Sequence, residues 1–409
     1  MKHPVARAAA LGTGALGIVL VVPLVAAGPA SAHASAQHRS DHQASRAPRV
    51  LYVSPKAVSA GSRTTSAQHA KNTGRSCSSA RFSDIQAAID AAPVGGKVVV
   101  CRGTYATSVT LDKRLTLQGE PGAVIDATAQ PYGVGVGASW STVRGLTVIN
   151  SSGTDESLPY DGIVTAAFTA TGPVPADHVT IEHNVVRGNH GSGIDLNSTS
   201  YSLARDNVAI ENGVGVNVAD DLGAPATHNL ITDNITDRNF GGCGIALADH
   251  SGLGVTDNVV SWNVSDDNGL STPTAPDASA GSGVILASPI PGGVVRNNVI
   301  SFNEFRGNGH AGVVVHQHVP NIPDGPTADF SGNRLLNNVI GTNNLRTDTS
   351  DTHTTGIYLG SANPLAITVR GNRISRDYYG IFTAGDVTVT GNHNQFRHVT
   401  VRVAGVPTY

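Results

Sequence analysis

Residues 244–250 read GIALADH, and six other stretches of the 409-residue chain echo this phrase. It begins with glycine, an apolar residue, a variable residue and usually a second apolar residue, and its equivalents start at Gly193, Gly215, Gly283, Gly312, Gly356 and Gly380. Some of these glycines are only 22, 24 or 29 residues apart. A unit of this length that holds short strands cannot bury its apolar side alone, so it must stack on its neighbours. The phrase therefore predicts a solenoid of stacked coils.

Asparagines recur with the same period. Two asparagines five residues apart, with a short apolar strand between them, precede most of the phrases: Asn184 and Asn189, Asn207 and Asn212, Asn234 and Asn239, Asn258 and Asn263, Asn298 and Asn303, and Asn333 and Asn338, with Asn372 and Asp377 closing the series. Side-chain amides at the same corner of successive coils can stack and form hydrogen-bonded ladders. We therefore expect these residues to lie in straight columns along the coil axis.

The segment before the repeat reads FSDIQAAIDAAPVGGKVVVCRGTY, residues 82–105. Ser83 is a suitable N-cap residue, Ile85, Ala88 and Ile89 form one apolar side, and Pro93 ends the helical pattern. The segment therefore predicts a short helix over residues 83–92, followed by a buried strand.

Together, the Gly phrases, the Asn pairs and the 82–105 segment resemble the right-handed parallel β-helix of the pectate-lyase-like superfamily over roughly residues 76–400. The 82–105 segment is similar to the entry helix and first coil of secreted actinobacterial-type β-helix proteins. The repeat resembles the periplasmic β-helix family typified by the nitrous-oxide-reductase maturation protein. We therefore predict an all-β chain, a single-stranded right-handed parallel β-helix of about ten coils with a short N-terminal capping helix.

The chain divides into four segments by composition. Residues 1–32 have the pattern of a secretory signal peptide, 33–75 that of a flexible linker with a short strand near 50–55, 76–120 hold the cap helix and first coil, and 121–409 the β-helix. Export would place the chain in an oxidising compartment. Because Cys77 and Cys101 bracket one helix-and-strand unit, we expect them to form a disulfide, which leaves Cys243 as a small buried residue.

The end of the Gly phrase varies, and we expect it to face solvent. Aligning the phrases on their glycines gives an outward column at the third position, Val164, Asp195, Asn217, Ala246, Ile285, Val314, Tyr358 and Phe382. The fifth and sixth residues after the glycine include Asp220, Asp221, Asp249, His250 and His318. Equivalent positions on successive coils lie about 4.8 Å apart. The alignment therefore predicts one solvent-facing patch of candidate catalytic residues: Asp195, Asp220, Asp221, Asp249, His250 and His318.

Such a patch has a defined chemistry. Carboxylates this close raise at least one pKa, and a protonated acid beside an ionised one is what glycoside hydrolysis needs, with a histidine as proton carrier. Candidate substrate-binding residues lie around the patch, namely Asn217, His190, His310, His316 and Tyr358. An aspartate ladder that caps turns, or a structural Ca²⁺ site, is the alternative reading of the same acids.

The sequence thus leaves three functions open. The first is a secreted enzyme that hydrolyses a polysaccharide through paired carboxylates; Asp220-Asp221 and His250 resemble the polygalacturonase-type order, although no Arg-x-Lys follows. The second is a non-catalytic adhesin or maturation factor that binds a glycan or protein through an exposed stripe of Ile285, Val314, Tyr358 and Phe382. The third is a metal-assisted polysaccharide lyase or epimerase.

The expected partner is a polysaccharide or other glycan. The net charge of −3 and the lack of a basic stripe disfavour nucleic acid. We expect no membrane association once the signal peptide is removed, a monomer, and no cofactor, with Ca²⁺ as the metal left open.

Overall fold

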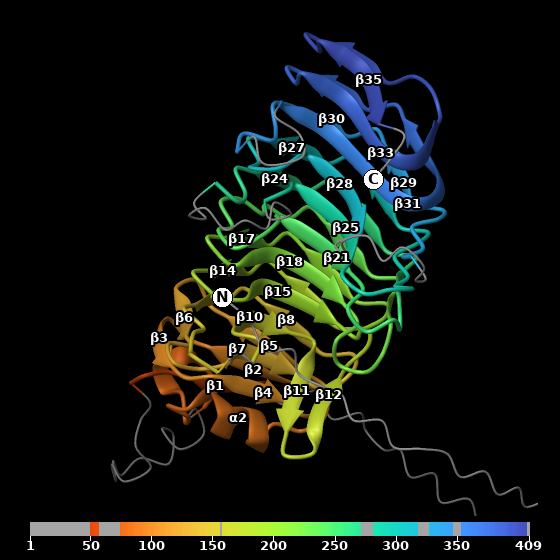
Figure 1. Cartoon of the computed structure of the whole chain (residues 1–409). Coiled ribbons are helices and arrows are strands. Elements are labelled where there is room, and N and C mark those ends of the chain that lie inside the picture. The colour runs from red at the N-terminus through yellow and green to blue at the C-terminus, as the bar shows by residue number, and fades with distance from the viewer. Residues whose placement is uncertain are drawn as a thin grey trace, which may run out of the picture. The chain divides into compact units, whose positions relative to one another are not determined.

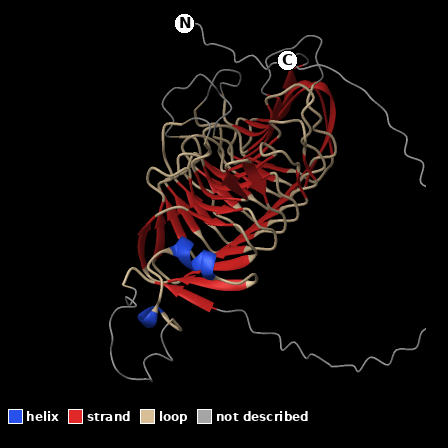
Figure 2. Cartoon of the chain, turned by 90° about the horizontal axis from the view of Figure 1, so that it is seen from below, coloured by secondary structure: helices blue, strands red, loops and turns tan. Residues whose placement is uncertain are grey.

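The computed structural model describes residues 50–56, 74–155, 158–270, 281–317, 327–346 and 353–406, all within the unit Arg46–Tyr409. The predicted signal peptide, most of the predicted linker and His318 lie outside the described residues. Figure 1 shows the described coils following one another in chain order along one axis, and Figure 2 shows that strands dominate them.

Each coil supplies strands to three parallel stacks, which we call the first, second and third faces. The first face holds β4 (Val109–Leu111), β7 (Tyr132–Val136), β10 (Asp161–Val164), β15 (Ser192–Asn197), β18 (Val214–Ala219), β21 (Ile245–Ala248), β25 (Val284–Ser288), β28 (Val313–Gln317), β31 (Thr355–Arg370), β33 (Tyr379–Thr390) and β35 (Val401–Val406).

The second face holds β1 (Val50–Val53), β2 (Gly96–Val100), β5 (Leu115–Gly119), β8 (Thr142–Arg144), β13 (Thr180–Glu182), β16 (Leu203–Arg205), β20 (Leu230–Thr232), β23 (Val259–Ser261), β26 (Val299–Ser301), β29 (Arg334–Leu336) and the far end of β31. The third face holds β3 (Gly103–Ala106), β6 (Ala123–Asp126), β9 (Thr147–Ile149), β14 (Val185–Arg187) and β17 (Val208–Ile210), and then β24 (Val264–Asp266), β27 (Glu304–Arg306), β30 (Val339–Ile340), β32 (Arg373–Ser375) and β34 (Gln395–Arg397), joined by bridges through Ile235. Two small pairs lie outside the faces, the antiparallel β11 (Ala166–Thr169) and β12 (Gly172–Pro175), and the parallel β19 (Ala226–Thr227) and β22 (Val255–Thr256).

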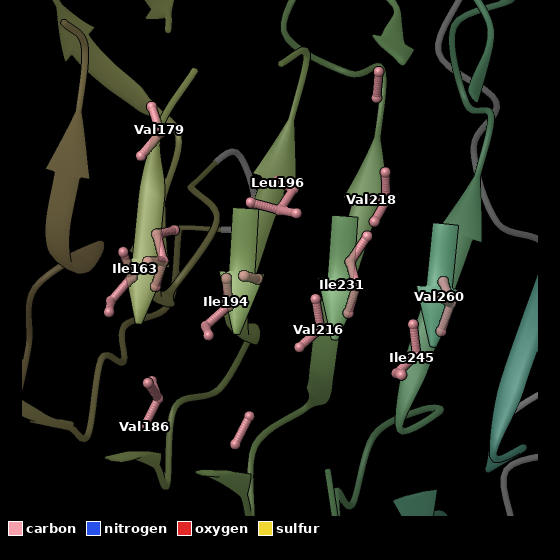
Figure 3. Close-up of a cluster of buried hydrophobic side chains, with 14 of the residues drawn as sticks. Ile163, Val179, Val186, Ile194, Leu196, Val216, Val218, Ile231, Ile245 and Val260 are labelled. Atoms are coloured by element: carbon pink, nitrogen blue, oxygen red, sulfur yellow. The ribbon is translucent and has the colours of Figure 1, made fainter. Parts of the chain in front are cut away.

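The register confirms the predicted columns of the first face. Ile163, Ile194, Val216 and Ile245 pair rung to rung and are fully buried, which Figure 3 shows as a row of side chains inside the coils. The residue after each of these is the outward one, and Asp195 pairs with Asn217 there. Burying one such aliphatic side chain contributes about 1.5–3 kcal/mol. The constant start of the Gly phrase is therefore core packing.

The phrase glycines are constant for a steric reason. A Cβ at Gly193 would lie 2.6 Å from Asn212 Nδ2 and 2.9 Å from the carbonyl oxygen of Gly215 on the next coil. A Cβ at Gly312 would meet the Nδ2 of Asn343 in the same way, at 2.9 Å. No side chain fits between the stacked backbones at this corner, so each coil needs glycine there.

Asparagine ladders hold the corners between faces. In the ladder between the second and third faces, Asn207 Oδ1 accepts both the backbone N–H of Asn184, at 3.0 Å, and its Nδ2–H, at 3.1 Å. This ladder runs through Asn184, Asn207, Asn234, Asn263, Asn303, Asn338, Asn372 and Asn394. The ladder between the third and first faces runs through Asn189, Asn212, Asn239, Asn268, Asn308, Asn343 and Asp377. The buried amides are thus paired from coil to coil.

The predicted pairing of the asparagines is wrong for three coils. Asn258, Asn298 and Asn333 lie with Asn229 in a third ladder, at the corner between the first and second faces. The partners five residues apart in these coils are Asn263 with Asn268, Asn303 with Asn308, and Asn338 with Asn343. All three corners prefer asparagine, so sequence spacing alone does not separate them.

The cap closes the N-terminal end of the coils. Helix α2 (Ile85–Ala91) buries Ile85, Ala88 and Ile89 against the core. Its N-cap is Asp84 and not Ser83 as predicted, because the Asp84 carboxylate accepts the N–H of Ala87 at 2.6 Å. The 3-10 helix η1 (Cys77–Ser79) brings Cys77 to Cys101, and the predicted disulfide is confirmed with Cα atoms 5.6 Å apart. No helix among the described residues is long and apolar enough to cross a membrane.

Candidate functional site

A cleft of about 530 Å³ lies on the outer side of the first face, over β10, β15 and β18. Its polar lining comes from adjacent coils, and the carboxylates there are Asp161, Asp195 and Asp221. Asn197, Asn217 and His190 also line it. The lining contains no lysine or arginine.

Two aspartates form a buried pair at this cleft. Asp161, at the start of β10, and Asp195, at the outward position of β15, are only 3% and 4% exposed. The two carboxyl groups lie close enough for each to change the pKa of the other. Asp161 Oδ1 accepts the backbone N–H of Ser192 at 2.7 Å, whereas its buried Oδ2 meets no donor among the described residues. A buried carboxyl oxygen that has no donor favours the protonated form of the group.

The environment raises both pKa values. Burial raises the pKa of Asp161 well above its usual range, and the charge of Asp195 adds to the shift. Burial also raises the pKa of Asp195 to about 6, with a smaller contribution from the charge of Asp221, while the amide of Asn197 opposes the shift. Because the two groups are coupled, they titrate as one unit that holds a proton to a higher pH than a separate carboxyl group does.

Asp221 and His250 form a second, more exposed pair beside the first. Asp221 Oδ1 lies 2.9 Å from His250 Nδ1, and the two side chains are 35% and 40% exposed. The hydrogen bond to Asp221 is the main cause that raises the pKa of His250. When the imidazole is protonated, the two side chains form an ion pair.

Asn197 connects the two pairs. Its Nδ2 donates to Asp195 Oδ2 at 3.0 Å and to Asp221 Oδ2 at 3.2 Å, and its Oδ1 accepts the backbone N–H of Asp221 at 2.9 Å. Asn217, on the next coil, donates to Asp195 Oδ1 at 2.9 Å. The site therefore holds a buried carboxyl pair with raised pKa values and, beside it, the more exposed Asp221, all in fixed positions. The sequence analysis did not identify Asn197 and did not count Asp161 among the catalytic candidates. Asn197 lies two residues after Asp195 in β15, so its side chain is expected on the same outer side of the strand.

Comparison with known proteins bears on the fold of this site. Residues 133–288, which include every strand under the cleft, match a family model described as a right-handed β-helix region. A search of the curated proteins found no match. Among solved structures, the pectate lyase Pel9A is similar with a TM-score of 0.57 and 17% identity, over 84% of this chain and 79% of that one. The chain has the fold of a right-handed parallel β-helix.

Other β-helix structures show the same fold at lower similarity. The Agl-KA catalytic domain has a TM-score of 0.54 and 15% identity, over 79% of this chain and 63% of that one. The A-module of the mannuronan C-5 epimerase AlgE4 from Azotobacter vinelandii has a TM-score of 0.46 and 20% identity, over 80% of this chain and 95% of that one. At these identities the likeness to Pel9A and to the Agl-KA domain concerns the fold of this β-helix and not its chemistry.

The structure corrects the predicted patch at Asp220 and Asp249. Both are fully buried, so the expectation that they face solvent is wrong. Asp220 accepts the backbone N–H groups of His250 and Leu253, both at 2.8 Å, and Asp249 accepts that of Gly252 at 2.6 Å. The fifth residue after the phrase glycine continues the inward alternation of the β-helix strand, so these acids cap turns between coils, as the alternative reading of the aspartates held.

Their pKa values agree with this role. Burial alone would raise the pKa of Asp220, but the backbone N–H groups, His250 first, hold it below its usual value. Burial raises the pKa of Asp249, and its donors, of which Val294 is the first, oppose that shift. Asp195, Asp221 and His250 are the predicted catalytic residues that the structure does bring together. His318 lies outside the described residues.

The predicted substrate-binding residues divide into two groups. Asn217 and His190 line the cleft, and His190 stacks on Tyr160 with ring centroids 6.2 Å apart. His310 and His316 lie instead around Tyr358, with ring centroids 6.0 and 6.2 Å from it, on later coils and away from the cleft lining.

The outward stripe predicted to be exposed is mostly buried. Ile285, Val314 and Tyr358 are 4%, 1% and 8% exposed, and Phe382 is half-buried with its ring stacked on Tyr358. They form a second apolar cluster on the outside of the first face, together with Cys243, Ala246, Ala287, Ala311 and Ala384. Large side chains on successive rungs cover one another, so this column offers no exposed docking stripe. Cys243 is buried, as expected.

The part of the chain that the structure describes shows no set of ligands for Ca²⁺. No group of three or more His, Cys, Asp or Glu side chains is arranged there to hold a metal ion. Ca²⁺ binding stays a prediction.

Proposed function

We propose that the cleft binds a glycan and hydrolyses one of its glycosidic bonds. The observation that carries this proposal is the buried Asp161–Asp195 pair, in which both pKa values are raised, beside the exposed Asp221. Two carboxyl groups whose environments push their pKa values apart are the acid and base arrangement of a glycosidase.

Each residue has a part in this reaction. The proton of the Asp161–Asp195 pair passes to the glycosidic oxygen as the bond to the anomeric carbon breaks. Water adds its oxygen to that carbon, and Asp221 takes up the water's proton. His250 forms a hydrogen bond with Asp221, and Asn197 fixes the distance between Asp195 and Asp221 through its two hydrogen bonds.

The charge of the cleft bears on the substrate class. The lining holds three carboxylates and no lysine or arginine, so an acidic sugar at the point of cleavage would meet repulsion without a compensating cation. The cleft therefore favours a neutral polysaccharide. The structurally similar pectate lyase is named for an acidic substrate. This lining supports elimination, the reaction of a lyase, less well than it supports hydrolysis.

A second candidate function is glycan binding without turnover. The observation that favours it is the short reach of the cleft, whose polar side chains among the described residues come from three adjacent coils. A screen of the full chain against neutral and acidic polysaccharides, with reducing-end and unsaturated-product readouts, separates hydrolase, lyase and binder.

Variants sharpen this screen. Asp195→Asn, Asp161→Asn and Asp221→Asn should each remove turnover while leaving the fold intact. Asp377→Asn is the matched control, since it makes the same change in an asparagine ladder outside the cleft lining. Reducing ends that form at the normal rate in Asp195→Asn would refute the hydrolase proposal, and so would a panel without any product.

We also infer that the chain is exported. The Cys77–Cys101 disulfide supports this, because such bonds persist in oxidising compartments. Residues 1–32 have a signal-peptide pattern. N-terminal sequencing of secreted protein should find a start at His33, and an uncleaved intracellular chain would contradict export.

A further inference from the structure

A groove of about 630 Å³ lies on the third face and is lined by basic side chains. Its first strand, β27, belongs to the second coil after the coil that begins with β18 under the cleft. Its basic lining residues are Arg306, Arg376, Arg397 and His398, all exposed, and none of the described lining residues is a carboxylate. The strands beneath it are β27, β30, β32 and β34, toward the blue end of Figure 1.

The repeat itself builds this groove. The strand register carries one outward column through Arg306, Gly341, Ser375 and Arg397. Two small residues thus separate two arginines that stand three rungs apart, or about 14 Å at the usual strand spacing. A Cβ at Gly341 would lie 2.8 Å from Arg306 Cγ, so the arginine side chain extends over this glycine. Small residues therefore form the bottom of the groove, and arginine side chains form its two ends.

The guanidinium groups are only partly neutralised. Arg306 forms an ion pair with Glu304 beside the groove. Arg376 and Arg397 form no ion pair with any of the described residues, although the whole chain carries a net charge of −3. Uncompensated arginines that stand along one groove match a ligand with several negative charges in a row, because each guanidinium fork pairs with a carboxylate or sulfate.

We propose that this groove binds an acidic polysaccharide, one that bears carboxylate or sulfate groups, and so anchors the protein to an anionic matrix. A single-stranded nucleic acid fits less well, because the lining has no phenylalanine, tyrosine or tryptophan on which bases could stack. The site is separate from the Asp161–Asp195 cleft. Its ligand therefore need not be the polymer that the cleft cleaves, and the proposal stands apart from the hydrolase reaction.

Affinity electrophoresis and calorimetry of the full chain test this proposal with polygalacturonate and heparin as acidic probes, dextran as the neutral probe and a poly-dT oligonucleotide. Wild type should bind one or both acidic glycans and not dextran, with affinity that falls as salt rises. The double variant Arg376→Gln/Arg397→Gln should bind about tenfold or more weakly, since each lost charge-assisted hydrogen bond contributes on the order of one decade.

Arg187→Gln is the matched control, because Arg187 lies on β14 of the same face, outside the groove lining, and should leave binding unchanged. Arg397→Lys keeps the charge and should retain most of the affinity. The Asp195→Asn variant should bind acidic glycans like wild type, which keeps this result distinct from failure of the hydrolase proposal. Equal binding of dextran, tighter binding of the oligonucleotide, no acidic-glycan binding, or full affinity in the folded double variant would each overturn the proposal.

Discussion

Asp377 interrupts an asparagine ladder, and replacing it with asparagine should stabilise the protein in a pH-dependent way. Its Oδ1 accepts the backbone N–H of Asn343 at 2.8 Å, as an asparagine would, but its buried Oδ2 has no partner among the described residues. The residue is 2% exposed. Burial raises the pKa of Asp377 from its ordinary 3.8 to about 8.

The magnitude follows from this shift. At pH 7 the carboxyl is protonated in the folded chain and ionised in the unfolded chain. A pKa difference of one unit corresponds to about 1.36 kcal/mol. The free energy of unfolding at pH 7 is therefore about 4 kcal/mol lower than at a pH below 3.8. Because the folded pKa is the raised one, the stabilising contribution is complete below pH 3.8 and is lost as the pH rises toward 8. An asparagine at this position carries no such cost, and its Nδ2 would extend the ladder.

The assay is denaturant unfolding of wild type and Asp377→Asn from pH 3 to pH 9. The variant should be more stable by about 4 kcal/mol at pH 7, and the difference should grow between pH 4 and pH 8 and then level off. Asp90→Asn is the control, since Asp90 is an exposed residue of α2. A stability difference that does not change with pH, or a variant less stable than wild type at pH 8, would refute this reasoning.

Three further predictions test other parts of the molecule. Asn303→Ala should destabilise the protein by about 2–4 kcal/mol in denaturant unfolding, because it leaves both the backbone N–H and the Nδ2–H of Asn263 without their buried acceptor; a loss below 1 kcal/mol would mean that water replaces the amide. Removing the disulfide with Cys77→Ala/Cys101→Ala should cost about 3 kcal/mol, the loop-closure value for a sequence separation of 24, and unchanged unfolding with and without reductant would contradict it. If a substrate is cleaved, the alkaline limb of the pH–kcat profile should lie above pH 6, because the pair that contains Asp195 keeps a proton there; a limb at pH 4–5 would point to an ordinary carboxylic acid.

Sequence reasoning reached the candidate site only in part. Aligning the phrases on their glycines placed Asp195 beside Asn217 correctly, because both lie inside regular strands where every rung repeats. The same alignment failed at Asp220 and Asp249, which lie where strands give way to turns. There the backbone N–H groups of the turn attract the carboxylates inward, and a count of residues from the glycine does not reveal that.

The sequence by itself determined the fold, the cap helix and the disulfide of this protein. Its glycines and asparagines are local requirements of each corner, and they recur in every coil because each coil packs against a copy of the same geometry. The tertiary structure alone decided the pairing of Asp161 with Asp195, the bridging role of Asn197 and the hollow between Arg306 and Arg397. These contacts join residues on different coils, and the direction of their side chains depends on turns of unequal length. The pKa values depend on burial, which arises only once the coils are stacked.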